Sequence, residues 1–309
     1  MFSLFDDGPR FYTDAALWLE CAVMKNLIAI LVSVAAISAS VLHAEDAKKI
    51  DFPQASPGAT VKQRIGVTDV SVEYSRPSAR ERKIFGGLLP YGQIWRTGAN
   101  AATKLTFSTD VKLGGVAVPA GSYALFTIPG ETEWTVILSK VTEEWGSYSY
   151  NQKDDQARIK VRSVSLAEPL ETMTIGVQDI RSGKANLVIA WEKTKVPIEI
   201  DTDVVAKVKP QIEAAMAGSG EKPYFAAAMF YYENDLDMKL AKEWIEAAAK
   251  KQPDAVWLIY RKGLILKKAG DKEGAMAAAK QALDLAAKEQ GEAKAEYTRL
   301  SEGLIASLK

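Results

Sequence analysis

The two residue types that enzymes use most often for catalysis are almost missing from this chain. Its 309 residues include one cysteine, Cys21, and one histidine, His43. Both precede Ala44, where we expect an N-terminal segment to be cut off, so the mature chain would contain neither. This excludes thiol nucleophiles, Ser-His-Asp triads, ordinary zinc sites, haem ligation by histidine and disulfides. We therefore expect no cofactor and no metal.

An excess of one charge and a long hydrophobic run are also missing. The chain has 39 basic and 39 acidic residues, and its net charge of zero argues against a nucleic-acid partner. The uncharged apolar run at 27–37 has 11 residues, which is short for a membrane span.

The N-terminal pattern is typical of a secretory signal peptide. Lys25 precedes the apolar run, and small residues continue to Ala44, after which we expect cleavage. Residues 1–23 are acidic and would be an upstream extension, with translation beginning at Met24. The signal (24–44) and a polar linker (45–58) would then precede an exported chain, periplasmic or secreted, without a stable membrane span. An uncleaved membrane anchor is the alternative.

Residues 59–201 carry the pattern of an all-β domain. Val70, Val72 and Tyr74 alternate with polar residues, and Gly114-Gly115 predicts a tight hairpin. Turn signals separate roughly nine or ten short strands. The expected strands lie near 70–74, 105–107, 111–113, 116–118, 123–128, 134–138, 159–161, 173–177, 187–191 and 196–200. This predicts an antiparallel β-sandwich or open barrel.

Residues 202–309 switch to Ala, Lys, Glu and Leu at helical spacing. The expected helices are 203–217, 223–234, 238–251, 255–268, 272–289 and 292–308. Asp237 and Ala241 recur 34 residues later as Asp271 and Ala275, a period that resembles the tetratricopeptide helix pair. Because one or two repeats rarely stack alone, we expect these helices to pack on the β domain or on another chain. An Ala-rich helical bundle is the alternative.

A chain without histidine or cysteine can still hydrolyse glycosides with two carboxylates. Three acidic pairs are available, although solvated turns would explain each of them: Glu143-Glu144, Asp154-Asp155 and Glu131 with Glu133.

The segment from Tyr91 to Phe107 combines an aromatic, an arginine, a glycine and an asparagine, which is typical of a recognition loop. Basic residues before it, including Arg76 and Lys83, would lie beside Arg96 and hold an anion, although such charge runs are usually solvated loops. Trp95 suits either a ligand contact or a core position, and Arg96 either a ligand contact or a clamp on backbone carbonyls.

A second polar, aromatic stretch runs from Glu143 to Asn151. Its Trp145 and Tyr148 are of the kind that stack on sugar rings or peptide side chains. The candidate ligand-binding residues are Tyr74, Arg76, Lys83, Trp95, Arg96, Asn100, Trp145 and Tyr148.

An ordered set of motifs in residues 50–195 resembles a bacterial family of exported domains of unknown function, DUF2911. The segments that carry the resemblance are 55–61, 74–77 (Tyr-Ser-Arg-Pro), 83–86, 89–92, 95–100 (Trp-Arg-Thr-Gly-Ala-Asn) and 119–129. The resemblance implies export and this domain layout, sometimes with tetratricopeptide-like helices behind. It implies no catalytic residue.

We expect an exported, non-catalytic binding or assembly module rather than an enzyme. Arg96 and Arg76 would hold a small anionic or carbohydrate-like ligand, Trp95 would pack on its apolar body, Asn100 would orient it, and the helices would dock a partner protein. The alternatives are a carboxylate-pair hydrolase of envelope glycans, acting through Glu144 or Asp154, and a structural envelope protein that assembles through its helices.

Overall fold

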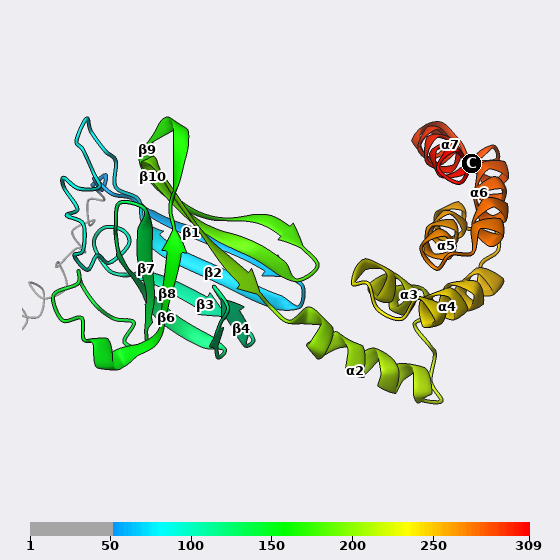
Figure 1. The fold of residues 1–309 in the computed structure, drawn as a ribbon, viewed down its shortest axis with the longest axis horizontal. Helices are drawn as coiled ribbons and strands as arrows, with labels where there is room; N and C mark the ends of the chain where they lie inside the picture. Colours follow the sequence, from blue (N-terminus) through cyan, green and yellow to red (C-terminus); the bar gives the residue numbers. More distant parts are fainter. Residues whose placement is uncertain (1–51) are drawn as a thin grey trace, which may run out of the picture. The chain divides into compact units, whose positions relative to one another are not determined.

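The computed structural model describes residues 52–309. The expected upstream extension, the signal segment and most of the linker therefore lie outside the described residues. The rest forms a β domain followed by six helices (Figure 1), which confirms the fold class expected from the sequence.

The larger sheet has six antiparallel strands. Its order is β1-β2-β3-β6-β7-β8. The strands are β1 (Gly58–Ile65), β2 (Thr68–Ser75), β3 (Thr103–Phe107), β6 (Gly121–Ile128), β7 (Glu133–Ser139) and β8 (Asp155–Arg162). β1 is an addition, because the sequence predicted no separate strand before Val70.

The smaller sheet has four antiparallel strands in the order β5-β4-β10-β9. They are β4 (Val111–Leu113), β5 (Val116–Val118), β9 (Val164–Arg181) and β10 (Lys184–Asp201). The two strands expected at 187–191 and 196–200 are one strand, β10. The pairing with β9 shifts register on both sides of Glu192, which has a φ of 52°, so the strand bends there without ending.

The two sheets enclose one hydrophobic core, to which both contribute alternate residues. On β2, Val70, Val72 and Tyr74 are buried, while Glu73 between them is exposed. This alternation follows from the strand period of two, which sends successive side chains to opposite faces. The larger sheet therefore has a second, outward face, which is covered by Ile94 and Tyr150 over β6 and β7 and carries exposed residues on β1 and β2.

Six helices follow β10. They are α2 (Val204–Ala217), α3 (Tyr224–Glu233), α4 (Met238–Lys251), α5 (Val256–Lys268), α6 (Lys272–Ala286) and α7 (Gly291–Ala306). Helices α3 to α7 form hydrophobic clusters of their own, joined only at their edge by Ile212 and Met216 of α2. In residues 52–309, none of these clusters includes a strand residue, and the expectation that the helices pack on the β domain or on another chain stays a prediction. No helix of the described residues has the length and apolarity that crossing a membrane requires.

The period of 34 residues is visible in the helix starts. Asp237 caps α4 and Asp271 caps α6, each accepting backbone N–H bonds of the first turn. Ala241 and Ala275 are fully buried at equivalent positions. Small residues at these places let neighbouring helices pack closely.

The start of α2 is fixed to the β domain by local contacts. A Cβ atom added at Gly66 would lie 3.0 Å from Val204, and one added at Gly183 would lie 2.5 Å from it. The Lys207 ammonium donates hydrogen bonds to the Asp110 carbonyl at 2.6 Å and to Thr109 Oγ1 at 2.7 Å. The first turn of α2 therefore contacts turns of both sheets.

Candidate functional site

The Tyr-Ser-Arg-Pro segment ties the end of β2 to β9 of the other sheet. The Tyr74 hydroxyl accepts from the Ile175 N–H at 2.9 Å and lies 3.2 Å from its carbonyl. Arg76 donates from Nε to the Met173 carbonyl at 3.0 Å and from Nη2 to Thr174 Oγ1 at 3.1 Å. The structure thus gives Tyr74 and Arg76 internal hydrogen-bond partners, and their contact with a ligand stays a prediction.

Trp95 lies in the core. Its indole is 5% exposed and is surrounded by Phe85, Trp134 and Trp191, with ring centres between 6.1 and 6.4 Å away. Its Nε1 donates to the Gly98 carbonyl at 3.0 Å. Of the two interpretations of Trp95, the structure supports the core position, because the indole is almost fully buried.

The loop after Trp95 is held together by its own hydroxyl and amide groups. Thr97 is fully buried, and Thr103 Oγ1 donates to its carbonyl at 2.7 Å. Asn100 donates from Nδ2 to Ser75 Oγ at 3.2 Å and to the Ser56 carbonyl at 3.3 Å. Asn100 therefore holds the loop against β2 and against the end of the linker at Ser56.

Lys83 and Arg96 are the two remaining basic candidates. Lys83 is exposed, and Arg96 is half-buried with an Nε that has no hydrogen-bond partner among the described residues. Arg96 therefore does not clamp a backbone carbonyl through this atom. Neither residue lines the hollow described next, and their contact with an anion stays a prediction.

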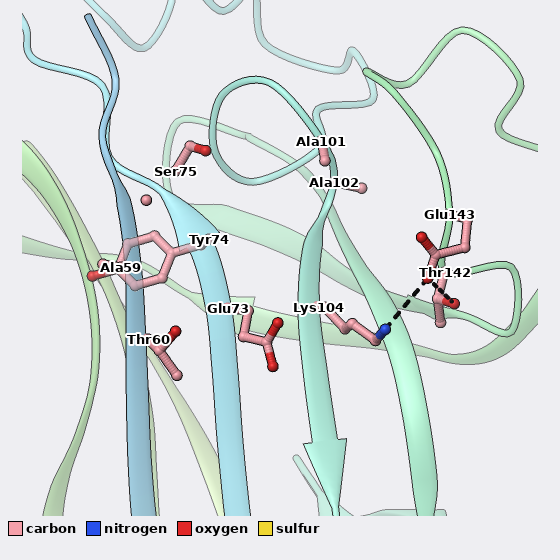
Figure 2. A pocket seen from close by; sticks show the side chains of 11 residues that line it. Ala59, Thr60, Glu73, Tyr74, Ser75, Ala101, Ala102, Lys104, Thr142 and Glu143 are labelled. Carbon is pink, nitrogen blue, oxygen red and sulfur yellow. Dashed lines mark hydrogen bonds and ion pairs between the residues drawn. The ribbon is translucent and has the colours of Figure 1, made fainter. Parts of the chain in front are cut away.

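The outward face of the larger sheet has a hollow of about 470 Å³ over β1, β2 and β3 (Figure 2). Glu73, Lys104 and Glu143 are its charged residues, and the Lys104 ammonium meets Glu143 Oε1 at 3.3 Å. The remaining lining is small or polar: Gly58, Ala59, Thr60, Tyr74, Ser75, Ala101, Ala102 and Thr142. Two carboxylates and one ammonium give the hollow a slightly negative lining.

Small side chains at one end create this hollow. Ser75, Ala101 and Ala102 leave the upper part open, while Glu73 and Lys104 project from neighbouring strands below them (Figure 2). A Cβ atom added at Gly58 would meet nothing within 4 Å, so a larger side chain there would occupy free space.

Two exposed aromatic residues continue from the wall of the hollow. Trp145 is 70% exposed, and its backbone forms a bridge with Ala101, a lining residue. Tyr148 is 88% exposed, and its ring lies over Gly146, where an added Cβ would be 2.6 Å from the ring. Of the predicted site residues, the structure places Trp145 beside the hollow and Tyr74 in its lining.

The segment between β7 and β8 is firmly anchored. Tyr150 packs on Phe126 of the outward face, with ring centres 5.3 Å apart. Arg158 Nη1 donates to the Tyr150 hydroxyl at 2.7 Å and to Asp155 at 2.8 Å, and Tyr150 lies 3.0 Å from the same carboxylate. Burial, followed by the bond to Asp155, raises the pKa of Tyr150. Trp145 and Tyr148 thus lie on a segment that is anchored to the larger sheet.

Glu144 differs from the neighbouring Glu143, which is exposed. Its Oε2 is buried and has no hydrogen-bond partner among the described residues. Burial, and to a lesser extent the negative charge of Asp154, raises the pKa of Glu144. Glu144 and Asp154, which belong to two different acidic pairs considered from the sequence, are therefore near enough for the charge of one to affect the other.

Sequence reasoning did not select Glu73, Lys104, Ser75 or Thr60 for the hollow. Each is an ordinary outward position of a strand, and no residue type marks it. The available signal was alternation, because Tyr74 points inward and Glu73 and Ser75 must then point outward.

The described fold is thus that of a two-sheet β domain with a surface hollow, followed by helices. Residues 56–200 match the model of the family described as "Protein of unknown function (DUF2911)", and this stretch spans nearly all of the β domain. The resemblance stated from the motifs is confirmed. No curated protein and no solved structure matches the chain.

Proposed function

We propose that the chain is a non-catalytic binding module whose β domain holds a carbohydrate-like ligand in the hollow over β1 to β3. The observation that supports this most is the pair of exposed aromatics, Trp145 and Tyr148, carried by the segment that walls a polar hollow. Aromatic faces pack on the apolar faces of sugar rings, while carboxylates, ammonium and hydroxyl groups bond to sugar hydroxyls.

The charge of the hollow favours an uncharged ligand over an anionic one. Glu73 and Glu143 line it together with only one cation, Lys104. The carboxylates of Glu73 and Glu143 would repel an anionic ligand in the hollow. Arg76, which was expected to hold an anion, donates its hydrogen bonds to β9 instead. An anionic ligand would have to bind elsewhere, near Arg96 or Lys83.

Calorimetric titration of the full chain with neutral glycans tests the proposal. We expect Trp145→Ala and Gly58→Tyr to weaken binding, the first by removing a stacking surface and the second by filling the hollow. Trp257→Ala is the matched control, because Trp257 is a partly exposed tryptophan on α5. Equal binding by all four proteins would contradict a ligand in this hollow.

The raised pKa of Glu144 supports one second candidate, a glycan hydrolase that uses Glu144 as acid and Asp154 as its partner. Chromogenic glycosides test it. Turnover by the full chain that Glu144→Gln abolishes would favour the hydrolase, and the absence of turnover on glycans that bind would exclude it.

Export and partner docking complete the proposal. Export rests on the pattern from Met24 to Ala44, which lies outside the described residues. The capped helices with a period of 34 residues support a tetratricopeptide-like segment that docks a partner protein. A chain purified from the exported fraction should begin near Glu45, and partners that co-purify should be lost when residues 202–309 are deleted.

A further inference from the structure

The outward face of the larger sheet continues beyond the hollow, along the same three strands. A second hollow of about 390 Å³ lies over β1 to β3, and Ser71, Thr106 and Lys62 are among its lining residues. Each lies two positions along its strand from a residue of the first hollow, namely Glu73, Lys104 and Thr60. The two hollows are therefore successive parts of one face.

The strand register arranges the outward side chains of this face in rows. Thr60, Glu73 and Lys104 form one row, and Lys62, Ser71 and Thr106 form the next. Ser122 of β6 extends the second row, with its hydroxyl 2.8 Å from that of Thr106. The second row thus presents three neighbouring hydroxyl groups, which donate and accept as sugar hydroxyls do.

One of these hydroxyls has no partner. Ser71 Oγ is buried and makes no hydrogen bond with the described residues. Buried polar atoms are usually satisfied, so an orphaned hydroxyl among the lining residues of a mostly apolar hollow suggests a missing partner.

The charges at the far end of the face cancel. Arg64 and Asp69 line the second hollow and form an exposed ion pair at 3.0 Å. Lys62 leaves the second hollow with one positive charge, and this balances the one negative charge by which Glu73 and Glu143 outnumber Lys104 in the first hollow. The two hollows together therefore carry no net charge that would select a charged polymer.

We propose that the two hollows are one extended site that binds a neutral oligosaccharide chain, lying along the strands from Trp145 toward the Arg64–Asp69 pair. This rests on the proposed function and adds to it that the ligand is an oligomer, not a single sugar. From Ser75 to Asp69 the site spans seven residues of β2, and the six steps between them cover roughly 20 Å at the rise of an antiparallel strand.

Calorimetric titration with N-acetylglucosamine oligomers, from the mono- to the hexasaccharide, tests the inference on the full chain. We expect affinity to rise at least about tenfold from the disaccharide to the tetrasaccharide. The double variant Ser71→Ala/Thr106→Val should lose that rise and still bind the disaccharide as before. Ser165→Ala/Thr194→Val, a cross-strand hydroxyl pair of β9 and β10, is the matched control and should keep it.

The double variant should remain folded. Ser71 Oγ has no partner among the described residues, so its removal leaves none of them unsatisfied. Thr106→Val removes the partner of the Ser122 hydroxyl, but this pair is exposed and water can replace it, and valine keeps the branched shape that strands favour. A melting temperature equal to that of the unaltered chain would show that weaker binding is not a folding defect.

The outcomes separate the inference from the proposed function. Equal affinity for disaccharide and tetrasaccharide, or a rise that persists in the double variant, would overturn the extended site while the first hollow remained a binding site. No binding of any oligomer would overturn both, and so would binding of an uncharged peptide of similar length in place of the glycans.

Discussion

Neighbouring residues of β2 show two contrasting regions of this molecule. Tyr74 belongs to a motif, points inward and bonds to Ile175 across the sandwich, whereas Glu73 and Ser75 point outward and line the hollow. The same contrast holds between Trp95, enclosed by three aromatic rings, and Trp145, which is 70% exposed. The conspicuous motif residues thus build the scaffold, and the unremarkable residues between them form the candidate site.

The largest expected effect of a substitution is on the scaffold side. Trp95→Ala should lower the free energy of unfolding by about 3–5 kcal/mol, because it opens a cavity among packed aromatic rings. Trp145→Ala, at an exposed position, should change it by less than about 0.5 kcal/mol. Urea denaturation of both variants measures this difference. Equal losses of unfolding free energy would contradict the contrast between the buried Trp95 and the exposed Trp145.

Arg76→Ala should have the next largest effect. It leaves the Met173 carbonyl and the Thr174 hydroxyl without their donor, which costs about 1–3 kcal/mol for buried groups. The same denaturation experiment measures it. If the variant instead lost ligand binding with an unchanged free energy of unfolding, Arg76 would contact the ligand, as expected from the sequence.

On the binding side, Trp145→Ala should weaken neutral glycan binding by about tenfold, equivalent to about 1.4 kcal/mol. The reason is the loss of one exposed aromatic face beside the hollow, with no change in the core. Titration calorimetry measures the change, and Tyr91→Ala, at another partly exposed aromatic, should leave affinity unaltered.

Glu144 gives a smaller effect that depends on pH. Its raised pKa means that the folded state binds the proton more tightly than the unfolded state, so the stability it contributes is present at low pH and lost as pH rises through the folded pKa. Glu144→Gln, which stays neutral, should therefore raise the melting temperature at neutral pH and have little effect well below pH 4. A lower melting temperature at neutral pH would show that the ionised carboxylate is stabilising.

The smallest effect should come from the Lys104–Glu143 pair. The two side chains are 36% and 85% exposed, so solvent screens the attraction and a double-mutant cycle should give less than about 1 kcal/mol. A coupling free energy well above that value would show that this ion pair contributes to the stability of the fold, which contradicts its assignment to the binding site alone.

The periodic parts of the fold could be predicted from the sequence. Strands from Val70 onward and the helix boundaries follow from alternation, turn glycines and caps such as Asp237 and Asp271. The continuity of β10 could not be predicted, because in the pattern of apolar and polar residues the bulge at Glu192 resembles the end of a strand.

The candidate site was less predictable. A strand pattern identifies which residues point outward, but it does not reveal that Thr60, Glu73 and Lys104 share one row, which depends on register. Nor does it reveal that Arg76 has its hydrogen-bond acceptors on β9, about a hundred residues further along the chain. The polar loop around Trp145 and Tyr148 predicted exposed aromatic side chains, and both are exposed in the structure. Their contact with a ligand stays a prediction.

The central claim is that ligand contacts the outward face of the larger sheet and not the Trp95–Asn100 loop. Mapping backbone amide chemical shifts during titration with the N-acetylglucosamine tetrasaccharide tests it most directly. We predict changes at Ser71, Glu73, Lys104 and Trp145. Changes confined to Lys83, Arg96 and their neighbours would contradict the claim and place the ligand at the basic loop.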